Sequence, residues 1–519
     1  MSPHYPSLYQ INTRVWLRRF DTPSQRATLR DIPPAYWDDL ASKGIDIVWL
    51  MGVWETVKST IPAYCLVDDL QQAYRAALPD WRIEDVIGSP YAVGRYRVSE
   101  KLGGNASLSA VRTQLHQRGM RLVLDFVPNH FSAHSPIIAE HPAIFLQGSP
   151  AQLQQSPKIF YRPPHVPEKI IAHGRDPYFA PWQDTAQIDY SLPAAQQHMI
   201  SELSAISELC DGVRCDMAML CLRSVFDRTW KAHRSAQHTE PRLTEPHTEP
   251  QHTEPQHTEP QHTHYREFWS DAIAEIRKKH PRFLFLAEVY WGLAPMLQQI
   301  GFDATYDKDL LDALKHEDFG RLTELLDQPA TQHARAIRFL ENHDEARAQA
   351  AFPPPRAQAA ALITYTLPSI RFFHDGQWEG KRIHLPVQLG REPDERPDPK
   401  VSAFYDQLLS LLNAPIYRDG RWHLLSLHPP APSSDHHRYL LAWLWSHHEQ
   451  RRLVVINPTP HTRSGRIFLA SWGHNAPFAL EDTLHTIPYL RDPHTLAQEG
   501  LYIFLQPHQA HLFAWSAVL

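Results

Sequence analysis

Four apolar runs in the chain end in charged or amide side chains that could take part in catalysis. The polar ends are Asp125–His130 (DFVPNH), Gly212–Asp216 (GVRCD), Ala287–Trp291 (AEVYW) and Glu341–Glu345 (ENHDE). A charged side chain next to Val, Leu, Ile and Phe is costly unless it is paired or used in chemistry. Four such ends therefore predict one shared polar site.

Two of these carboxyl groups lie in settings that favour opposite protonation states. Arg214 and Asp216 are two residues apart and share a face on a strand, so the guanidinium is expected to hold Asp216 ionised, as a nucleophile. Glu288 follows Phe-Leu-Phe-Leu-Ala, an apolar setting expected to raise its pKa and keep it protonated, as an acid. Cleavage of a glycosidic bond needs such a pair.

A structural interpretation stays open for three carboxyls. Asp216 precedes Met217 and Asp344 precedes Glu345, and a helix beginning at either point would take the carboxylate as its cap. Asp125 suits a structural hydrogen-bond acceptor at the end of a strand.

Side chains from four distant segments can meet only if those segments end at the same place. Short apolar runs alternate with helical stretches such as Leu108–Gly119 and Tyr265–His280, the pattern of repeated βα units with a parallel sheet. Eight units predict an α/β protein with a (β/α)8 TIM barrel over residues 1–414, whose C-terminal rim would gather the catalytic residues. The predicted strands are Leu8–Trp16, Ile45–Val53, Arg121–Val127, Gly212–Asp216, Phe283–Val289, Phe302–Tyr306, Ala336–Leu340 and Ser369–Phe373.

Departures from this repeat predict two further domains. Asp125 and Asp216 are 91 residues apart, more than one βα unit needs, so we expect a small excursion domain over residues 131–190, after the third strand. Beyond residue 414, alternating runs between turn residues predict a C-terminal antiparallel β-sandwich domain over residues 415–519. Its predicted strands are Tyr439–Trp445, Arg452–Asn457, Gly465–Leu469, Gly500–Leu505 and Ala510–Trp515.

Residues 237–264 repeat the sequence QHTEP, with proline at nearly every fifth position. Proline at that spacing prevents a helix, and the segment has almost no apolar side chain to bury, so we predict a disordered insertion. The alternative is a weak site for a divalent metal, formed by its histidines and glutamates.

The composition disfavours several classes of protein. The 51 Lys and Arg against 57 Asp and Glu give a net charge of −6, which argues against a nucleic-acid partner. No apolar stretch is long enough to span a bilayer and the first residues do not resemble a secretory signal, so we expect a cytoplasmic protein without a membrane partner. The four cysteines show no CxxC spacing, which predicts reduced core residues rather than disulfides or a zinc site.

Together and in this order, the four polar segments resemble the short motif regions of the α-amylase superfamily, glycoside hydrolase family 13. Ser89–Tyr96 (SPYAVGRY) resembles the family's segment with a sugar-stacking tyrosine, and Ala186–Tyr190 (AQIDY) resembles its additional short region. The resemblance covers nearly the whole chain, and it implies a catalytic barrel with a C-terminal β-domain.

The resemblance implies a role for each matching residue. Asp216 would be the nucleophile, Glu288 the general acid and base, and Asp344 the third carboxylate, which orients the sugar and stabilises the transition state. The expected substrate-binding residues are Tyr91, His130, Arg214, His343, Asp125 and Asn129.

Two departures from the family pattern bear on specificity and on metal binding. Many starch-degrading members have Lys-His where this chain has Met219-Leu220, so polar contacts from that pair to the leaving sugar are missing. Gln187 stands where calcium-binding members often have an aspartate, which leaves only Asn129 as a ligand, although Ca²⁺ takes about six to eight oxygens. We therefore expect no metal and no cofactor, with a structural calcium as the alternative.

These observations predict a retaining hydrolase that acts on α-glucans or maltooligosaccharides by double displacement, with the two carboxyls about 5–5.5 Å apart. Transglycosylation or isomerisation of sucrose, maltose or trehalose uses the same steps and remains an alternative. The alternative of a different class is a non-catalytic glycan-binding barrel, which the presence of all three carboxyls disfavours.

Overall fold

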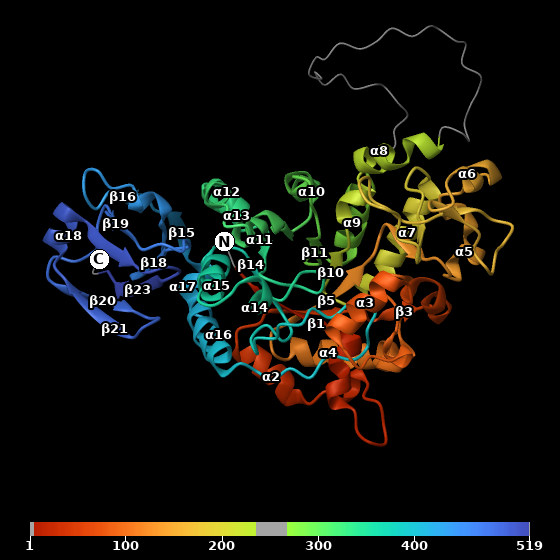
Figure 1. Ribbon diagram of the computed structural model, residues 1–519, viewed down its shortest axis with the longest axis horizontal. Helices are drawn as coiled ribbons and strands as arrows, with labels where there is room; N and C mark the ends of the chain where they lie inside the picture. Colours follow the sequence, from red (N-terminus) through yellow and green to blue (C-terminus); the bar gives the residue numbers. More distant parts are fainter. Residues whose placement is uncertain (1–4, 235–266, 518–519) are drawn as a thin grey trace, which may run out of the picture.

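A closed barrel of eight parallel strands lies at the centre of the protein (Figure 1). This computed structural model describes residues 5–234 and 267–517, so the predicted repeat insertion at 237–264 lies outside the described residues. All eight predicted strands are confirmed, but the first ends at Asn12 because Thr13–Trp16 form a helical turn, α1. In barrel order they are β1 (Ser7–Asn12), β14 (Ile370–His374), β13 (Ala336–Arg338), β12 (Ala304–Tyr306), β11 (Leu284–Ala287), β10 (Gly212–Cys215), β5 (Arg121–Phe126) and β2 (Ile47–Met51).

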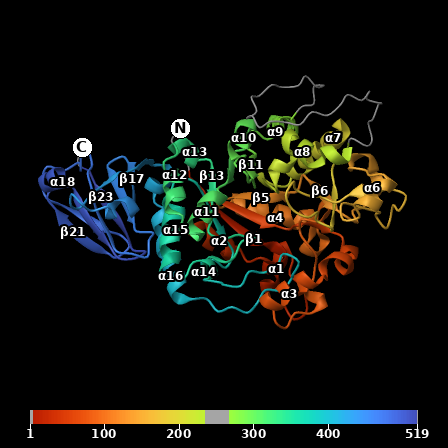
Figure 2. The same cartoon turned by 45° about the horizontal axis from the view of Figure 1, so that its top comes forward.

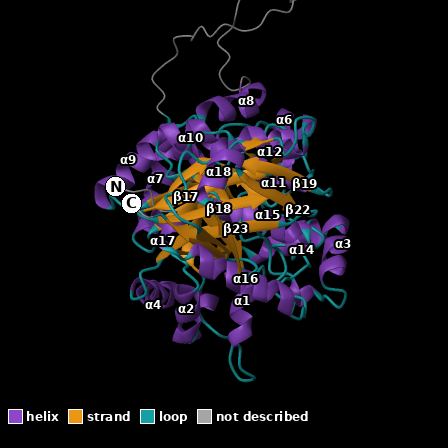
Figure 3. Ribbon diagram, turned by 90° about the vertical axis from the view of Figure 1, so that its left-hand side faces the viewer, coloured by secondary structure: helices purple, strands orange, loops and turns teal. Residues whose placement is uncertain are grey.

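Helices connect these strands and surround the barrel (Figures 2 and 3). In α9, for example, Trp269, Ile273 and Ile276 are buried on one side of the helix, because residues three and four apart share a face. The helices between the strands and after β14 are α2 (Pro34–Ser42), α4 (Gly104–His116), α7 (Pro193–Ser207), α8 (Arg223–Arg234), α9 (Phe268–Lys279), α10 (Ala294–Ile300), α11 (Lys308–Lys315), α12 (Phe319–Leu326), α13 (Ala330–His333), α14 (Ala348–Ala351), α15 (Arg356–Thr366), α16 (Pro399–Leu412) and α17 (Pro415–Asp419).

The strand register aligns the polar residues of the central strands. Arg214 of β10 is paired with Asp125 of β5 on one side and with Leu286 of β11 on the other. Close approach of β10 to β11 requires glycine at position 212, where a Cβ atom would lie 2.5 Å from the Cβ of Leu284. Residues that directly follow β10 and β11 therefore meet at the C-terminal rim.

Two irregular lobes interrupt the βα repeat near that rim. The predicted excursion contains two short antiparallel pairs, and it leaves the barrel after β5 and returns at α7. The other lobe, between β2 and β5, is not anticipated by the sequence analysis and has a small core of its own around Cys65 and Tyr74. The paired strands are β6 (His130–Ser132) with β9 (Thr185–Gln187), β7 (Phe160–Tyr161) with β8 (Ile171–Ala172), and β3 (Trp54–Thr56) with β4 (Val93–Val98), and the helices of the two lobes are α3 (Asp68–Ala77), α5 (Ile137–Glu140) and α6 (Pro150–Gln155).

The predicted C-terminal antiparallel β-domain is confirmed, with a six-stranded and a three-stranded sheet enclosing an apolar core. Its four additional strands, β15, β16, β20 and β21, are not predicted from the sequence. In sheet order the strands are β15 (Arg421–Leu424), β17 (Leu441–His447), β18 (Gln450–Ile456), β23 (Ala510–Ser516), β20 (Phe478–Asp482) and β21 (Ile487–Arg491), then β16 (Leu427–His428), β19 (Arg463–Ile467) and β22 (Leu501–Leu505), with α18 (Pro493–Glu499) before β22.

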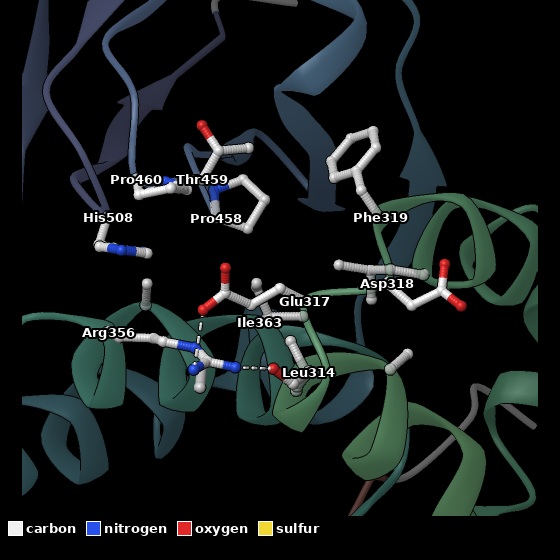
Figure 4. Close-up of a pocket in the computed structure, with 14 residues that line it drawn as sticks. Leu314, Glu317, Asp318, Phe319, Arg356, Ile363, Pro458, Thr459, Pro460 and His508 are labelled. Carbon is white, nitrogen blue, oxygen red and sulfur yellow. Dashed lines mark hydrogen bonds and ion pairs between the residues drawn. The ribbon is translucent and has the colours of Figure 1, made fainter. Parts of the chain in front are cut away.

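One face of the six-stranded sheet covers the domain's own apolar core, and the other face packs against the barrel helices. Trp443 and Trp445 of β17 are fully buried in the core shared with the barrel, and the indole of Trp445 donates a hydrogen bond to the carbonyl of Thr366 in α15. A pocket of about 80 Å³ remains at this junction, where the ion pair of Arg356 and Glu317 faces His508 of the C-terminal domain (Figure 4). The catalytic candidates do not line this pocket.

All four cysteines are buried and unpaired, as predicted. Among the described helices, none combines the length and the apolar character needed to cross a bilayer.

Candidate active site

Arg214 joins the two carboxyl groups that the sequence predicts as nucleophile and acid. Its Nη1 donates to Oδ1 of Asp216 at 2.6 Å, and its Nη2 donates to Oε2 of Glu288 at 2.7 Å. The guanidinium is buried and lies 5.2 Å from the ring centroid of Trp49 and 5.4 Å from that of Tyr91. One cation therefore fixes two carboxyl groups at adjacent strand ends and is itself held between aromatic rings.

Glu288 has the elevated pKa that its apolar surroundings predict. Burial raises the pKa to about 7 and the charge of Asp216 adds to this, while Arg214 opposes the shift. Oε2 also accepts the backbone N–H of Met217 at 2.8 Å, and Oε1 accepts the hydroxyl of Tyr290 at 2.7 Å. Glu288 thus keeps its proton up to near-neutral pH and is held in one orientation.

Asp216 differs from the expectation in one respect. Burial raises its pKa above the usual value although Arg214 works to lower it, so the pKa of Asp216 shifts in the same direction as that of Glu288 and not in the opposite one. The side chain of Asp216 is almost completely removed from water, and the nearby charges of Asp344 and Asp125 add to the rise. Asp216 does not cap a helix, because the turn that follows has Met217 as its N-terminal cap.

Asp344 is the most exposed of the three carboxyls and the one with a lowered pKa. Desolvation works to raise that pKa, but the imidazole of His343 and the charge of Arg214 outweigh it and bring the pKa to about 2. His343 Nε2 lies 3.0 Å from Oδ2 of Asp344, whose side chain is 50 % exposed. Asp344 does not cap a helix either, since α14 begins only at Ala348.

His343 connects this carboxylate to the lobe that carries Tyr91. Its Nε2 lies 2.6 Å from the Tyr91 hydroxyl, and the two rings stack with centroids 5.3 Å apart. Its Nδ1 lies 2.7 Å from the amide nitrogen of Gln10 in β1. A ring held at both nitrogens keeps a fixed orientation beside the carboxyl group.

Asp125 is buried and serves mainly to organise the site. Its carboxylate accepts the indole N–H of Trp49 at 3.1 Å and the backbone N–H of Gly52 at 2.8 Å. Burial raises the pKa of Asp125, although Arg214 lies on the neighbouring strand. The structural interpretation of Asp125 is thus the one that its contacts support.

Asn129 and His130 lie at the base of the excursion domain. The amide nitrogen of Gln187 donates to both oxygens of Asn129, main chain and side chain, at 3.0 Å, and to the carbonyl of Ile188 at 3.0 Å. Both oxygens of Asn129, the one remaining candidate ligand, are therefore turned toward an N–H donor, so these residues do not fit calcium. Burial lowers the pKa of His130 to about 4, and its ring lies 5.5 Å from that of Trp182.

One further group in the described part of the chain has a metal-like composition. Asp482, His485 and His511 place their ligand atoms within 4.8 Å of one another in the C-terminal domain. Oδ2 of Asp482 lies 2.7 Å from Nδ1 of His485 and 2.6 Å from Nδ1 of His511. These are hydrogen-bond lengths, and the two imidazoles satisfy a carboxylate that is completely buried.

Comparison with known proteins identifies a matching family. A family model described as "Alpha amylase, catalytic domain" matches residues 40–382, more than half of the sequence. The chain belongs to the α-amylase family.

Three similar proteins are each less than 25% identical to this α-amylase family chain. The α-amylase MalA of Haloarcula japonica is 22% identical over 326 residues, which are 61% of this chain and 39% of that protein. The crystal structure of an α-amylase from Lactobacillus plantarum superposes with a TM-score of 0.65 at 18% identity, covering 98% of both chains. The noncanonic maltogenic α-amylase AmyB from Thermotoga neapolitana gives 0.65 at 16% identity, again with 98% of both chains covered. These structures show a shared fold.

Four residues that complete the site are missed by the sequence analysis. Tyr290 and Tyr306 contact Glu288 and Arg214 directly, with the Tyr306 hydroxyl accepting from Arg214 Nε at 3.3 Å. Gln10 and Trp49 hold His343 and Asp125. Two of them could be found from the sequence. Gln10 is a polar residue inside the apolar strand SLYQIN, and Tyr290 lies two residues after Glu288.

Proposed function

We propose that this α-amylase family protein is a retaining hydrolase of α-glucosidic bonds in α-glucans or maltooligosaccharides. The observation that carries the proposal is the bridge from Arg214 to both Asp216 and Glu288, at 2.6 and 2.7 Å. It holds a nucleophile beside an acid whose pKa is about 7. A proton donor near neutral pH and an adjacent carboxylate suit double displacement.

In the first step, Asp216 attacks the anomeric carbon and Glu288 gives its proton to the glycosidic oxygen, which leaves with the bonding electrons. The products are a glucosyl ester on Asp216 and a free sugar hydroxyl. In the second step, the ionised Glu288 takes a proton from water, and the resulting hydroxyl displaces Asp216. Two inversions at one carbon give net retention.

The other polar residues support these steps. The positive charge of Arg214 balances the negative charge of Asp216 before attack. Asp344 is ionised because its pKa is about 2, and it stabilises positive charge on the reacting sugar. Tyr91 and His343 stack together beside that position and are suited to contact the sugar ring. The same second step with a sugar hydroxyl in place of water would give transglycosylation, which product analysis separates from hydrolysis.

Proton NMR of the first products formed from maltohexaose tests the proposal. We expect the α anomer before mutarotation, whereas an initial β anomer would show inversion and a wrong role for Asp216. Glu288→Gln provides a second test, because α-glucosyl fluoride has a leaving group that needs no protonation. This variant should lose far more activity on maltohexaose than on the fluoride, and equal losses would remove Glu288 from the acid role.

A further inference from the structure

Three segments of the rim that lie across the barrel from Glu288 are joined to one another. In the closed barrel order, β1 is four strands away from β11 in either direction, and β14 and β2 flank it. Glu288 directly follows β11, so the segments that follow β1, β14 and β2 lie on the opposite side of the site. These segments are the turn α1, the loop of residues 375–398 and the lobe between β2 and β5.

Arg14 of α1 connects all three segments close to the candidate site. Its Nη2 donates to the carbonyl of Gly88 in the lobe at 2.9 Å and to the carbonyl of Val387 in the loop at 3.0 Å. Burial lowers the pKa of Arg14 to about 10, and the nearby groups of Tyr91 and Asp125 oppose that shift. The guanidinium therefore stays charged at neutral pH and holds the loop and the lobe together beside the site.

The loop and the lobe are also joined to each other directly. The N–H of Ile87 donates to the carbonyl of Gln388 at 2.8 Å, and the N–H of Gly390 donates to the carbonyl of Asp85 at 2.7 Å. Arg391 donates from Nε and Nη2 to the two carboxylate oxygens of Asp85, at 2.9 and 2.8 Å. A two-point ion pair of this kind fixes geometry as well as charge, so the two segments are held as one rigid unit.

The joined segments extend to the residues beside the reacting centre. In the loop, Nε2 of His384 lies 2.9 Å from the carbonyl oxygen of His343, and His384 also interacts electrostatically with Asp344. In the lobe, the hydroxyl of Tyr91 lies 2.6 Å from Nε2 of His343. The joined segments therefore start at the proposed contacts of the reacting sugar. We call them the far wall, which consists of residues 13–16, 85–91 and 384–391.

The direction of the substrate chain follows from the chemistry of the proposed acid. Glu288 protonates the oxygen that leaves C1 of the reacting sugar, so the leaving chain lies on the side of Glu288. An α-1,4-glucan continues toward its non-reducing end through C4, which lies across the pyranose ring from C1. The chain beyond C4 is therefore directed away from Glu288 and toward the far wall. An enzyme that cuts within a chain needs an open groove on both sides, whereas a wall on this side requires that the chain end there.

We propose that the far wall makes this enzyme act at the non-reducing ends of α-glucans, so that it releases a short product and does not cut within chains. This inference rests on the proposed function, because it takes Glu288 as the acid. Arg14 and Arg391 are positioning residues for this specificity, since they hold the three segments together without having to contact the substrate.

A substrate with a blocked non-reducing end tests the far wall. Cleavage of p-nitrophenyl maltoheptaoside, followed by chromatography, is compared with cleavage of the same compound carrying a 4,6-O-ethylidene group on its terminal glucosyl unit. The value of kcat/KM for the blocked compound should be at least about a hundredfold lower, because its end does not fit against the wall. Similar values for the two compounds, or ready cleavage of β-cyclodextrin, which has no chain end, would overturn the proposal.

Two substitutions test the residues that hold the wall together. Arg391→Ala removes the ion pair at the outer side of the wall, where the side chain is 33% exposed, and Arg14→Ala removes the link close to the site. In each variant, kcat/KM for the blocked compound relative to the free one should rise about tenfold. Arg321→Ala is the matched control, since Arg321 is likewise a partly exposed arginine in ion pairs, with Asp309 and Glu324, but lies in α12. A ratio that stays at the parent value would overturn the proposal, and Arg391→Ala decides the test if Arg14→Ala does not fold.

A binding measurement separates failure of the far wall from failure of the proposed function. The free and the blocked maltoheptaosides are titrated calorimetrically into Asp216→Asn. We expect the free compound to bind at least about tenfold more tightly, whatever the turnover of the parent. Equal affinities, or binding of neither compound, would reject the far wall even if Asp216 and Glu288 act as proposed. A preference for the free end together with an initial β anomer would instead reject the proposed mechanism and support the far wall.

Discussion

Replacing Tyr290 by phenylalanine should move the alkaline limit of activity upward. The Tyr290 hydroxyl donates to Oε1 of Glu288 at 2.7 Å, and this bond favours the ionised carboxylate. Its loss therefore raises the pKa of Glu288 above its present value of about 7. Because the acid must be protonated to act, activity should persist to higher pH in Tyr290→Phe.

The size of this shift can be worked out from the bond. A hydrogen bond to a charged group contributes about 1.5–3 kcal/mol, and one pKa unit corresponds to about 1.4 kcal/mol, so the full bond is worth roughly one to two units. The phenol also interacts with the protonated acid, which cancels part of the difference. We expect the alkaline limb of kcat/KM to move from about pH 7 to roughly pH 8.

The assay is kcat/KM for maltohexaose as a function of pH, which reports ionisations of the free enzyme. Tyr74→Phe is the matched control, because its hydroxyl donates to the carbonyl of Cys65 in the separate small core of the lobe after β2. A limb that stays in place in Tyr290→Phe, or that moves to lower pH, would refute the assignment of Glu288 as the group behind it.

Three other predictions follow from the site and the sequence. Asp216→Asn should fold normally and lose more than about a thousandfold in turnover of maltohexaose, because an amide cannot form the glucosyl ester; turnover within about tenfold of the parent would contradict this role. Chelation with EDTA should leave the melting temperature unchanged, since Gln187 turns an N–H donor toward the oxygens of Asn129; a large drop reversed by Ca²⁺ would show an unrecognised site. Deleting residues 239–261 should alter melting temperature and activity little, because the repeat brings almost no apolar side chain to a core; metal-dependent activity lost on deletion would favour the alternative reading of its histidines.

The barrel could be predicted because its strands are buried on both faces and end abruptly in polar residues. Arg121–Val127 and Phe283–Val289 combine an apolar run with a carboxyl group close to its end, a pattern that marks the ends of parallel strands. The predicted first strand is four residues too long, because Thr13–Trp16 form the helical turn α1, where Val15 and Trp16 are buried as they would be in a strand. Periodicity does not distinguish the two over four residues.

The missed strands of the C-terminal domain have identifiable causes. The strand β21 contains Pro488 and lies at the edge of the six-stranded sheet, where proline is tolerated, so its sequence argues against a strand. The strand β16 is only two residues long and leaves no periodic signal. Intrinsic strand propensity does not predict these two strands, because they form through pairing with neighbouring strands in the folded domain.

The sequence predicts the raised pKa of Glu288 but not the direction of the shift at Asp216. The spacing of Arg214 and Asp216 indicated a shared face, and the two groups do form an ion pair. The sequence could not show that Glu288 from another strand takes the second arm of the same guanidinium. Burial and the nearby charges of Asp344 and Asp125 then raise the pKa of Asp216, which depends on the assembled barrel.

Trapping of the covalent intermediate tests the central claim most directly. 5-Fluoro-α-glucosyl fluoride has a good leaving group and a substituent that destabilises the transition state of the second step, so the glucosyl ester should accumulate. Digestion and mass spectrometry should then locate the added fluoroglucosyl group on Asp216. A label on Glu288 or Asp344, or turnover of the compound with no labelled peptide, would contradict double displacement through Asp216.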